Sequence, residues 1–101
     1  MKDITTQSIR VWSEQRNLHN ADPFKQLAKL MEEIGELAEC MNKNSNEEDT
    51  ALELGDIYVV ITILAQQLGL DIEYCKNKAY DKIVNRKGKT INGVFVKEGD
   101  L

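Results

Sequence analysis

The feature that most constrains this sequence is an apolar run from Ile57 to Ala65, set in a stretch rich in helix-forming residues. It is about half of the roughly 20 residues that a membrane-spanning helix needs, so we expect it in a soluble core. From Ile57 to Leu64 the helix has almost no polar side. Such a helix is buried from several directions, by its own domain or by a second subunit. We therefore expect a homodimer or a dimer of dimers with closed symmetry.

The remaining sequence also favours helix over strand, because it holds one proline and six glycines among many Leu, Glu, Lys and Gln residues. Asp22 and Asp71 are candidate N-caps, and Pro23 suits a first helical position. Gly69 and Gly88 are candidate stops. The predicted helices run from about Ile4 to about Asn17, from Pro23 to about Asn42, from after Ser45 to about Leu68, and from Asp71 to about Lys87.

Two of these helices have a predicted inward face. In the second it holds Leu27, Leu30, Met31, Ile34, Ala38 and Met41, and in the fourth Ile72, Cys75, Ala79 and Ile83, with Tyr80 beside them. Beyond the helices, residues 91–96 read as a turn between short extended pieces. We predict one domain over residues 1–101, an all-α antiparallel four-helix bundle with a short extended C-terminal appendage.

Two acidic pairs stand out within these helices. Glu33 with Glu36, and Glu53 with Asp56, are each three residues apart, so each pair aims two carboxylates to one side of its helix. If the two helices pack face to face, four carboxylates converge and repel one another unless a cation neutralises them. Oxygen ligands favour Mg²⁺ or Mn²⁺ over Zn²⁺. The pairs therefore predict a magnesium site.

The simpler alternative is that these are ordinary solvated acids, since the chain has seventeen. Against it, the stripe through Glu53 and Asp56 continues into apolar residues, Val60 and Ile63, which indicates an inward face. Gly35 and Gly55 lie in these turns and suggest close approach of a neighbouring helix or ligand. A di-iron bundle calls for Glu-x-x-His pairs, and the single histidine, His19, lies in a predicted turn.

The acidic residues also match a family pattern. Glu32-Glu33-x-x-Glu36, sixteen intervening residues and Glu53-x-x-Asp56 resemble the signature of the MazG-like, all-α nucleoside triphosphate pyrophosphohydrolase superfamily. The similarity covers roughly Phe24 to Gly88. It includes the context Lys-Leu-Met-Glu-Glu-Ile-Gly-Glu-Leu-Ala-Glu and the sequence Glu-Leu-Gly-Asp before the apolar run.

This resemblance implies that Glu33, Glu36, Glu53 and Asp56 hold Mg²⁺, with Mn²⁺ as a substitute. It implies cleavage of a nucleoside triphosphate between its α- and β-phosphates, giving a monophosphate and pyrophosphate. Carboxylate-held Mg²⁺ suits that chemistry, which needs charge neutralisation and an activated water. Glu33 and its neighbour Glu32 are the catalytic candidates, Glu32 as a base or supporting group. A deoxynucleotide (dUTP or dCTP) pyrophosphatase and a phosphoribosyl-ATP pyrophosphohydrolase are close alternatives.

Candidate substrate-binding residues lie outside the acidic pairs. Lys82 and Arg86 are four apart on the predicted basic fourth helix, and their distance in sequence from Asp56 resembles that of the family's Lys-x-x-x-Arg phosphate-binding pair. Trp12 and Arg16, also four apart, can stack on a base and reach a phosphate, although such a tryptophan is more often core or interface. Lys29 shares the side of Glu33, but a surface position is the stronger expectation for it.

Charge and composition bear on other classes of function. A net charge of −4 argues against general nucleic-acid binding, although a nucleic-acid binder that uses the basic segment from Lys76 to Lys89 stays open to test. A non-catalytic dimeric helical interaction module is the main alternative to an enzyme. The N-terminus lacks the apolar run of a signal peptide, and Cys40 and Cys75 match no metal-ligand spacing. We expect a cytoplasmic protein with no membrane partner.

Overall fold

Side-chain caps set the start of each helix in the computed structural model, which describes residues 3–101. In every case a side-chain oxygen of the capping residue accepts a hydrogen bond from a backbone N–H of the first turn. The predicted caps Asp22 and Asp71 are confirmed. The four helices also confirm the predicted all-α class. The helices, with their caps in parentheses, are α1 Ile4–Gln15 (Asp3), α2 Pro23–Asn42 (Asp22), α3 Glu47–Gln67 (Asn46) and α4 Ile72–Ile83 (Asp71).

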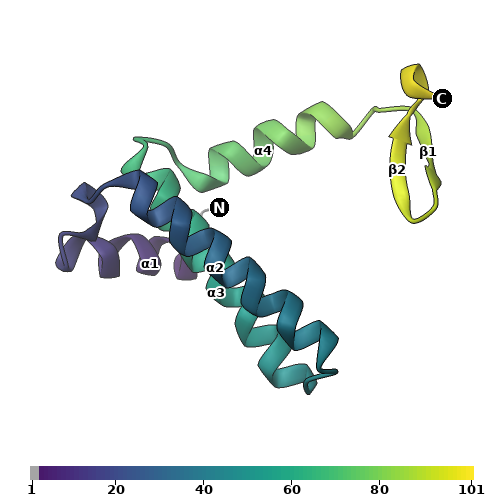
Figure 1. Cartoon of the computed structure of the whole chain (residues 1–101). Helices are drawn as coiled ribbons and strands as arrows, with labels where there is room; N and C mark the ends of the chain where they lie inside the picture. The colour runs from purple at the N-terminus through teal and green to yellow at the C-terminus, as the bar shows by residue number, and fades with distance from the viewer. Residues whose placement is uncertain (1–2) are drawn as a thin grey trace.

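Two long helices, α2 and α3, pack along each other as an antiparallel hairpin (Figure 1). α1 crosses one end of this hairpin and packs on α3, followed by the short 3₁₀ segment η1 (Leu18–Asn20). α4 turns away from α3 at 102° and carries the C-terminal strands outward. The radius of gyration is 16.3 Å, whereas a compact domain of this length has about 13 Å. The chain by itself is therefore unusually extended.

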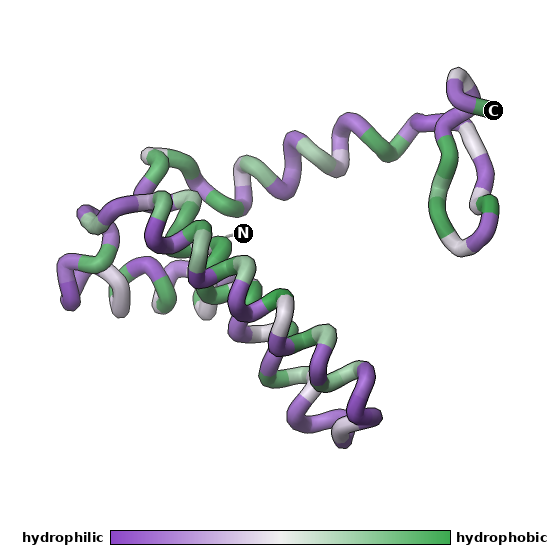
Figure 2. The backbone as a smooth tube through the Cα atoms, viewed as in Figure 1, coloured by the Kyte–Doolittle hydropathy of each residue, from purple (hydrophilic) through white to green (hydrophobic). Residues whose placement is uncertain are grey.

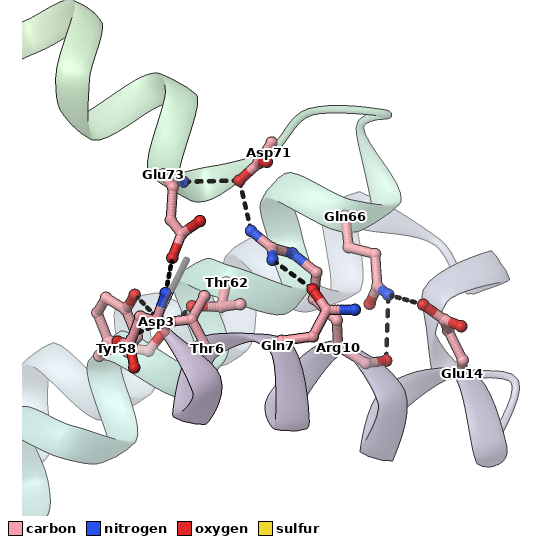
Figure 3. Close-up of polar contacts among 10 residues, drawn as sticks. All are labelled: Asp3, Thr6, Gln7, Arg10, Glu14, Tyr58, Thr62, Gln66, Asp71 and Glu73. Atoms are coloured by element: carbon pink, nitrogen blue, oxygen red, sulfur yellow. Dashed lines mark hydrogen bonds and ion pairs between the residues drawn. The ribbon is translucent and has the colours of Figure 1, made fainter. Parts of the chain in front are cut away.

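A polar network fastens α1 and the start of α4 to α3 (Figure 3). The Thr6 hydroxyl donates to the Asp3 carboxylate at 2.9 Å and lies 2.6 Å from the Tyr58 hydroxyl. The backbone N–H of Asp3 donates to Glu73 at 3.0 Å. Arg10 forms an ion pair with Asp71, the capping residue of α4. The direction of α4 is thus set by contacts with α1 as well as by its link to α3.

The predicted C-terminal appendage is a β-hairpin. β1 (Gly88–Ile91) and β2 (Val94–Lys97) pair antiparallel, with Gly88 opposite Lys97. The two turn residues, Asn92 and Gly93, both have positive φ, 51° and 79°, as the tightest hairpin turns require. A Cβ on Gly88 would lie 2.2 Å from the carbonyl oxygen of Val96. Gly88 is therefore needed for strand pairing, and a short 3₁₀ segment, η2 (Glu98–Asp100), follows the hairpin.

The predicted ends of two helices are wrong by a few residues. α4 ends at Ile83, not near Lys87, because the carbonyl of Lys87 accepts a hydrogen bond from Glu98 and belongs to the hairpin. Arg86 therefore lies beyond the helix, and the prediction that Lys82 and Arg86 share a helical face is also wrong. α1 ends at Gln15, before Asn17 adopts a left-handed conformation.

The apolar core of the chain is small. Within residues 3–101, the buried hydrophobic residues are Val60, Ile63 and Ala65, all on α3. This confirms that α3 is central and that its stripe continues inward from Asp56.

The predicted inward faces are mostly exposed. On α4, Tyr80 and Ile83 are more than half exposed, and only Ile72 and Cys75 of the predicted set are half-buried. On α2 the exposed apolar residues include Leu27, Met31, Ile34 and Met41. Figure 2 shows hydrophobic stretches along these helices and the hairpin. The prediction for α2 is mostly wrong within one chain, because the buried residues of α2 are Gln26 and Glu33. Of the predicted apolar set only Leu30 is half-buried.

The two helical glycines have no close neighbour in the described chain. A Cβ built on Gly35 or Gly55 meets nothing within 4 Å. The prediction that a neighbouring helix of the same chain approaches them closely is therefore wrong.

Among residues 3–101, no single helix is long and apolar enough to cross a membrane. α3 and α4 pass the length and composition test only when they are taken together across their 102° bend. Met1 and Lys2, the first residues of the N-terminus considered above, lie outside the described residues.

Candidate metal centre

The acidic residues meet where α2 and α3 pack against each other. Glu33 projects from α2, and Glu53 and Asp56 project from the first half of α3. One carboxylate oxygen from each of the three lies within 4.8 Å of those of the other two. We call Glu33, Glu53 and Asp56 the acidic cluster. The i, i+3 spacing on α3 and the antiparallel packing of the hairpin together produce this convergence.

The acidic cluster lacks hydrogen-bond donors on its buried side. Glu33 is only 6% exposed, and its Oε2 atom and the Oε2 atom of Glu53 are buried without a hydrogen-bond partner. Burial raises the pKa of Glu53 to about 7, and the nearby carboxylates of Glu33, Glu36 and Asp56 add to that shift. Buried anionic oxygens are costly unless they are paired or bound to a metal. The residues present therefore fit a hard divalent cation.

Glu36, the fourth predicted ligand, lies beside the acidic cluster. The charge of Glu33 raises the pKa of Glu36, and a hydrogen bond with Glu53 opposes that shift. Glu36 is half-buried, one turn along α2 from Glu33. Glu36 is not among the residues whose oxygens meet within 4.8 Å, but it adjoins the acidic cluster through Glu33 and Glu53.

A lysine sits against the exposed side of the acidic cluster. The Lys29 Nζ atom lies 3.2 Å from Oε1 of Glu33 and 3.7 Å from Oε1 of Glu32. Its contact with Glu33 raises the pKa of Lys29. Glu32, the other catalytic candidate, is 58% exposed at its side chain. Sequence reasoning favoured a surface position for Lys29, and the structure confirms it: the side chain is 49% exposed, and its ammonium also contacts Glu33.

A pocket of about 320 Å³ opens on the acidic cluster. Glu33 and Asp56 form part of its wall, together with Trp12 of α1 and Lys29 of α2. The Arg16 guanidinium stacks on the Trp12 indole, 4.2 Å from the ring centroid, and donates to the Trp12 carbonyl at 3.0 Å. An aromatic surface and the Lys29 ammonium therefore share the pocket with the carboxylates, and Arg16 is attached to that aromatic surface.

Lys82 and Arg86 do not line this pocket. Lys82 instead borders a separate hollow of about 470 Å³ on α4, with Leu70, Tyr74 and Lys78 among its other walls. Both residues lie on the part of the chain that extends away from the α2–α3 hairpin (Figure 1). A phosphate-binding role for them in the site of the same chain has no support in this arrangement.

Gln26 belongs to the site region and was missed by sequence reasoning. It is buried, lines the pocket, and donates from Nε2 to the Val60 carbonyl at 3.3 Å. The available signal was its position seven residues before Glu33, which places both side chains on one face two turns apart. This hydrogen bond links α2 and α3 one turn beyond Asp56.

Comparison with known families agrees with the acidic signature. The MazG nucleotide pyrophosphohydrolase domain matches residues 23–91, from the start of α2 to the end of β1. This chain belongs to that family. The matched range contains all four predicted ligands and excludes α1, which holds Trp12, and Arg16, which follows it.

Two curated relatives of this MazG chain differ in how much of the chain they match. An uncharacterized 18.2 kDa protein in the rep-hol intergenic region of Haemophilus phage HP1 (strain HP1c1) is 44% identical over 66 residues, 63% of this chain. The chain spans only 39% of that protein's length. The uncharacterized protein YpjD of Bacillus subtilis (strain 168) is 30% identical over 95 residues, covering 85% of this chain and 81% of YpjD. No solved structure matches.

Proposed function

We propose that this MazG chain hydrolyses nucleoside triphosphates, ribo- or deoxyribonucleotides, to the monophosphate and pyrophosphate, with Mg²⁺ as its cofactor. The observation that carries the proposal is the acidic cluster: three carboxylates from two helices meet within 4.8 Å, and two of their oxygens are buried without a donor. We further propose a housekeeping role in the cytoplasmic nucleotide pool, consistent with the free thiols Cys40 and Cys75.

The proposed ligands of Mg²⁺ are Glu33, Glu53, Asp56 and Glu36. When bound, the ion supplies charge neutralisation for the phosphates and lowers the pKa of a coordinated water. Glu33 is buried where α2 packs on α3, and this burial restricts the positions open to its carboxylate. Glu32 is exposed beside it and is proposed to accept a proton from the attacking water.

Nucleotide binding is proposed to use Trp12 and Arg16. The indole lines the pocket that also contains Glu33 and Asp56, so a base stacked on it leaves its phosphates directed toward the carboxylates. The stacked guanidinium of Arg16 adds positive charge at this surface. Stacking tolerates every base, so this geometry supports the nucleotide class without selecting one base.

A homodimer, alone or paired into a dimer of dimers, is the proposed assembly. The chain buries few apolar residues, leaves one apolar face of α2 exposed, and has a radius of gyration of 16.3 Å. Large apolar patches on a small protein usually mark interfaces. In such an assembly, α4 of one chain can bring Lys82 and Arg86 to the pocket of its partner, which one chain alone does not achieve.

The decisive experiment is a nucleotide panel incubated with the protein and Mg²⁺, with products resolved by ion-exchange chromatography. Monophosphate plus pyrophosphate supports the proposal, and diphosphate plus phosphate contradicts it. No turnover of any nucleotide, with a folded dimer, would favour the interaction-module alternative. Salt-sensitive binding of DNA or RNA would favour the nucleic-acid alternative.

A further inference from the structure

Within residues 3–101, Lys29 forms the one ion pair that reaches the acidic cluster, with Glu33. Its ammonium lies 3.2 Å from Oε1 of Glu33, while Oε2 of the same carboxylate is buried without a partner. A single positive charge thus faces the exposed side of the acidic cluster, whose inner oxygens are left without a counter-charge. Among the described residues, Lys29 is therefore the cationic group in contact with the acidic cluster.

A divalent ion bound to Glu33 changes the environment of this ammonium. The ion adds two positive charges within a few ångströms of a third, so the attraction that holds Lys29 to Glu33 is weakened by repulsion. The Lys29 side chain is 49% exposed and lines the pocket with Trp12 and Asp56. A lysine side chain has four rotatable carbon links, so it can leave Glu33 without any movement of α2.

We infer that Lys29 acts as a stand-in cation that the metal displaces from Glu33 and that then binds a substrate phosphate oxygen. This inference rests on the proposed function, because it needs a metal at the acidic cluster and a phosphate in the pocket. Lys29 therefore couples the two binding steps: it opposes metal binding in the empty site and favours phosphate binding in the metal-loaded site.

A triphosphate brings about four negative charges to the pocket, and among its walls Lys29 is the cationic residue. When the ammonium leaves the carboxylate, it forms another charge-assisted hydrogen bond with phosphate. The new contact therefore offsets most of the interaction free energy of the old one. Lys29 and Glu33 both line the pocket, so the ammonium can pass from the carboxylate to a phosphate within the same pocket.

The matched control is Lys43, which forms an equivalent ion pair away from the acidic cluster. Lys43 pairs with Glu39 at the C-terminal end of α2, as Lys29 pairs with Glu33. The fourteen positions between the two lysines put them about 21 Å apart along the helix. Lys43→Gln removes the same charge at the C-terminal end of the same helix without touching the pocket.

The first test measures Mn²⁺ alone, by electron paramagnetic resonance titration of the full chain without nucleotide. Lys29→Gln is expected to bind Mn²⁺ about threefold to tenfold more tightly than the wild type, because the competing ammonium is gone. Lys29→Arg, which keeps the charge, and Lys43→Gln are expected to match the wild type. Unchanged or weaker Mn²⁺ binding by Lys29→Gln would overturn the inference.

The second test measures inorganic pyrophosphate by isothermal titration calorimetry at saturating Mg²⁺. Lys29→Gln is expected to weaken pyrophosphate binding by about tenfold, the loss of one charge-assisted hydrogen bond. Metal and pyrophosphate affinities thus change in opposite directions, which a general loss of stability cannot produce. Equal pyrophosphate affinity in Lys29→Gln and Lys43→Gln would also overturn the inference.

The two proposals fail in distinguishable ways. If the wild type binds no Mn²⁺, the proposed metal site is wrong and the Lys29 inference is wrong with it. If the wild type binds Mn²⁺ and hydrolyses nucleotides but Lys29→Gln behaves like Lys43→Gln in both titrations, only the role of Lys29 is wrong.

Discussion

Glu33 of α2 and Glu53 of α3 are twenty residues apart in sequence, yet their carboxylates lie within 4.8 Å, each with one buried oxygen that no donor reaches. This relationship makes the removal of one ligand the most direct test of the site. Asp56→Asn and Glu36→Gln are each expected to lower kcat/KM at least about a hundredfold, because even groups that only support metal ligands contribute 10- to 100-fold.

Circular dichroism should show unchanged helicity in both variants, and Mn²⁺ affinity should fall. Glu39→Gln is the control, since Glu39 is exposed on the same helix and pairs with Lys43 away from the acidic cluster. Full activity of both Asp56→Asn and Glu36→Gln would show that the acidic residues are not the metal site.

The metal-free chain is expected to lose stability as the pH rises. Burial raises the pKa of Glu53 to about 7 from 4.5, so the folded state holds a proton that the unfolded state has released. That stabilisation is fully present below pH 4.5 and is lost as the pH rises through 7. The raised pKa of Glu36 acts in the same direction.

Thermal melts in EDTA and in Mg²⁺ check this dependence. In EDTA, Tm should fall between about pH 5 and about pH 8, and Mg²⁺ should raise Tm most at the upper end, where Glu53 is ionised. Glu53→Gln should flatten the profile. The lowered pKa values of Asp3 and Glu39 affect stability only in more acidic solution. A Tm in EDTA that rises over this range would contradict the prediction.

Trp12 should report nucleotide binding directly, because it is the single tryptophan of the chain. We expect quenching of its fluorescence when nucleotide binds, and an increase in KM of about tenfold in Trp12→Ala, within the range for loss of one base-stacking contact. Trp12→Phe should be intermediate. Tyr80→Ala removes a similarly exposed aromatic side chain on α4 and should leave KM unchanged. Unaltered KM in Trp12→Ala would make Trp12 an interface residue.

Arg86 tests whether two chains build one site. Arg86→Ala is expected to reduce kcat/KM about tenfold to a hundredfold, as for one lost charge-assisted hydrogen bond, and Lys87→Ala to change little. Light scattering should give at least a dimer at micromolar concentration. An active monomer would refute the proposed assembly.

Mixing variants separates a shared site from a site within one chain. After Glu53→Gln and Arg86→Ala are denatured and refolded together, a random mixture of dimers should regain about a quarter of wild-type activity if each pocket takes Arg86 from the partner. No recovery is expected if both residues act within one chain, since every pocket then carries one defect.

Arg10 should contribute to stability by holding the start of α4. Its side chain is 12% exposed and pairs with Asp71, so Arg10→Ala removes an ion pair from the residue that caps α4. We expect a loss of about 1.5–3 kcal/mol in the free energy of unfolding, measured by urea denaturation. Hydrogen exchange should increase most in the first turn of α4. Arg16→Ala, an exposed arginine also near α1, is the control and should cost far less.

Local sequence signals alone determined most of the helices and the nature of the site. Asp22 followed by Pro23, and Asp71, act within one helical turn, so their capping roles could be predicted without knowledge of the fold. Asn92-Gly93 likewise specifies its hairpin turn. The spacing of Glu53 and Asp56 determined that their carboxylates project from one side of one helix.

The tertiary structure alone decided which residues from different helices meet. The burial of Glu33, its contact with Lys29 and the exposure of the apolar face of α2 all depend on the rotation of α2 about its axis against α3. Helical periodicity identifies faces but does not say which face packs inward when two are candidates. The direction of α4 likewise depends on the long-range pair Arg10–Asp71, sixty-one residues apart, and such pairs leave no periodic signal in a sequence.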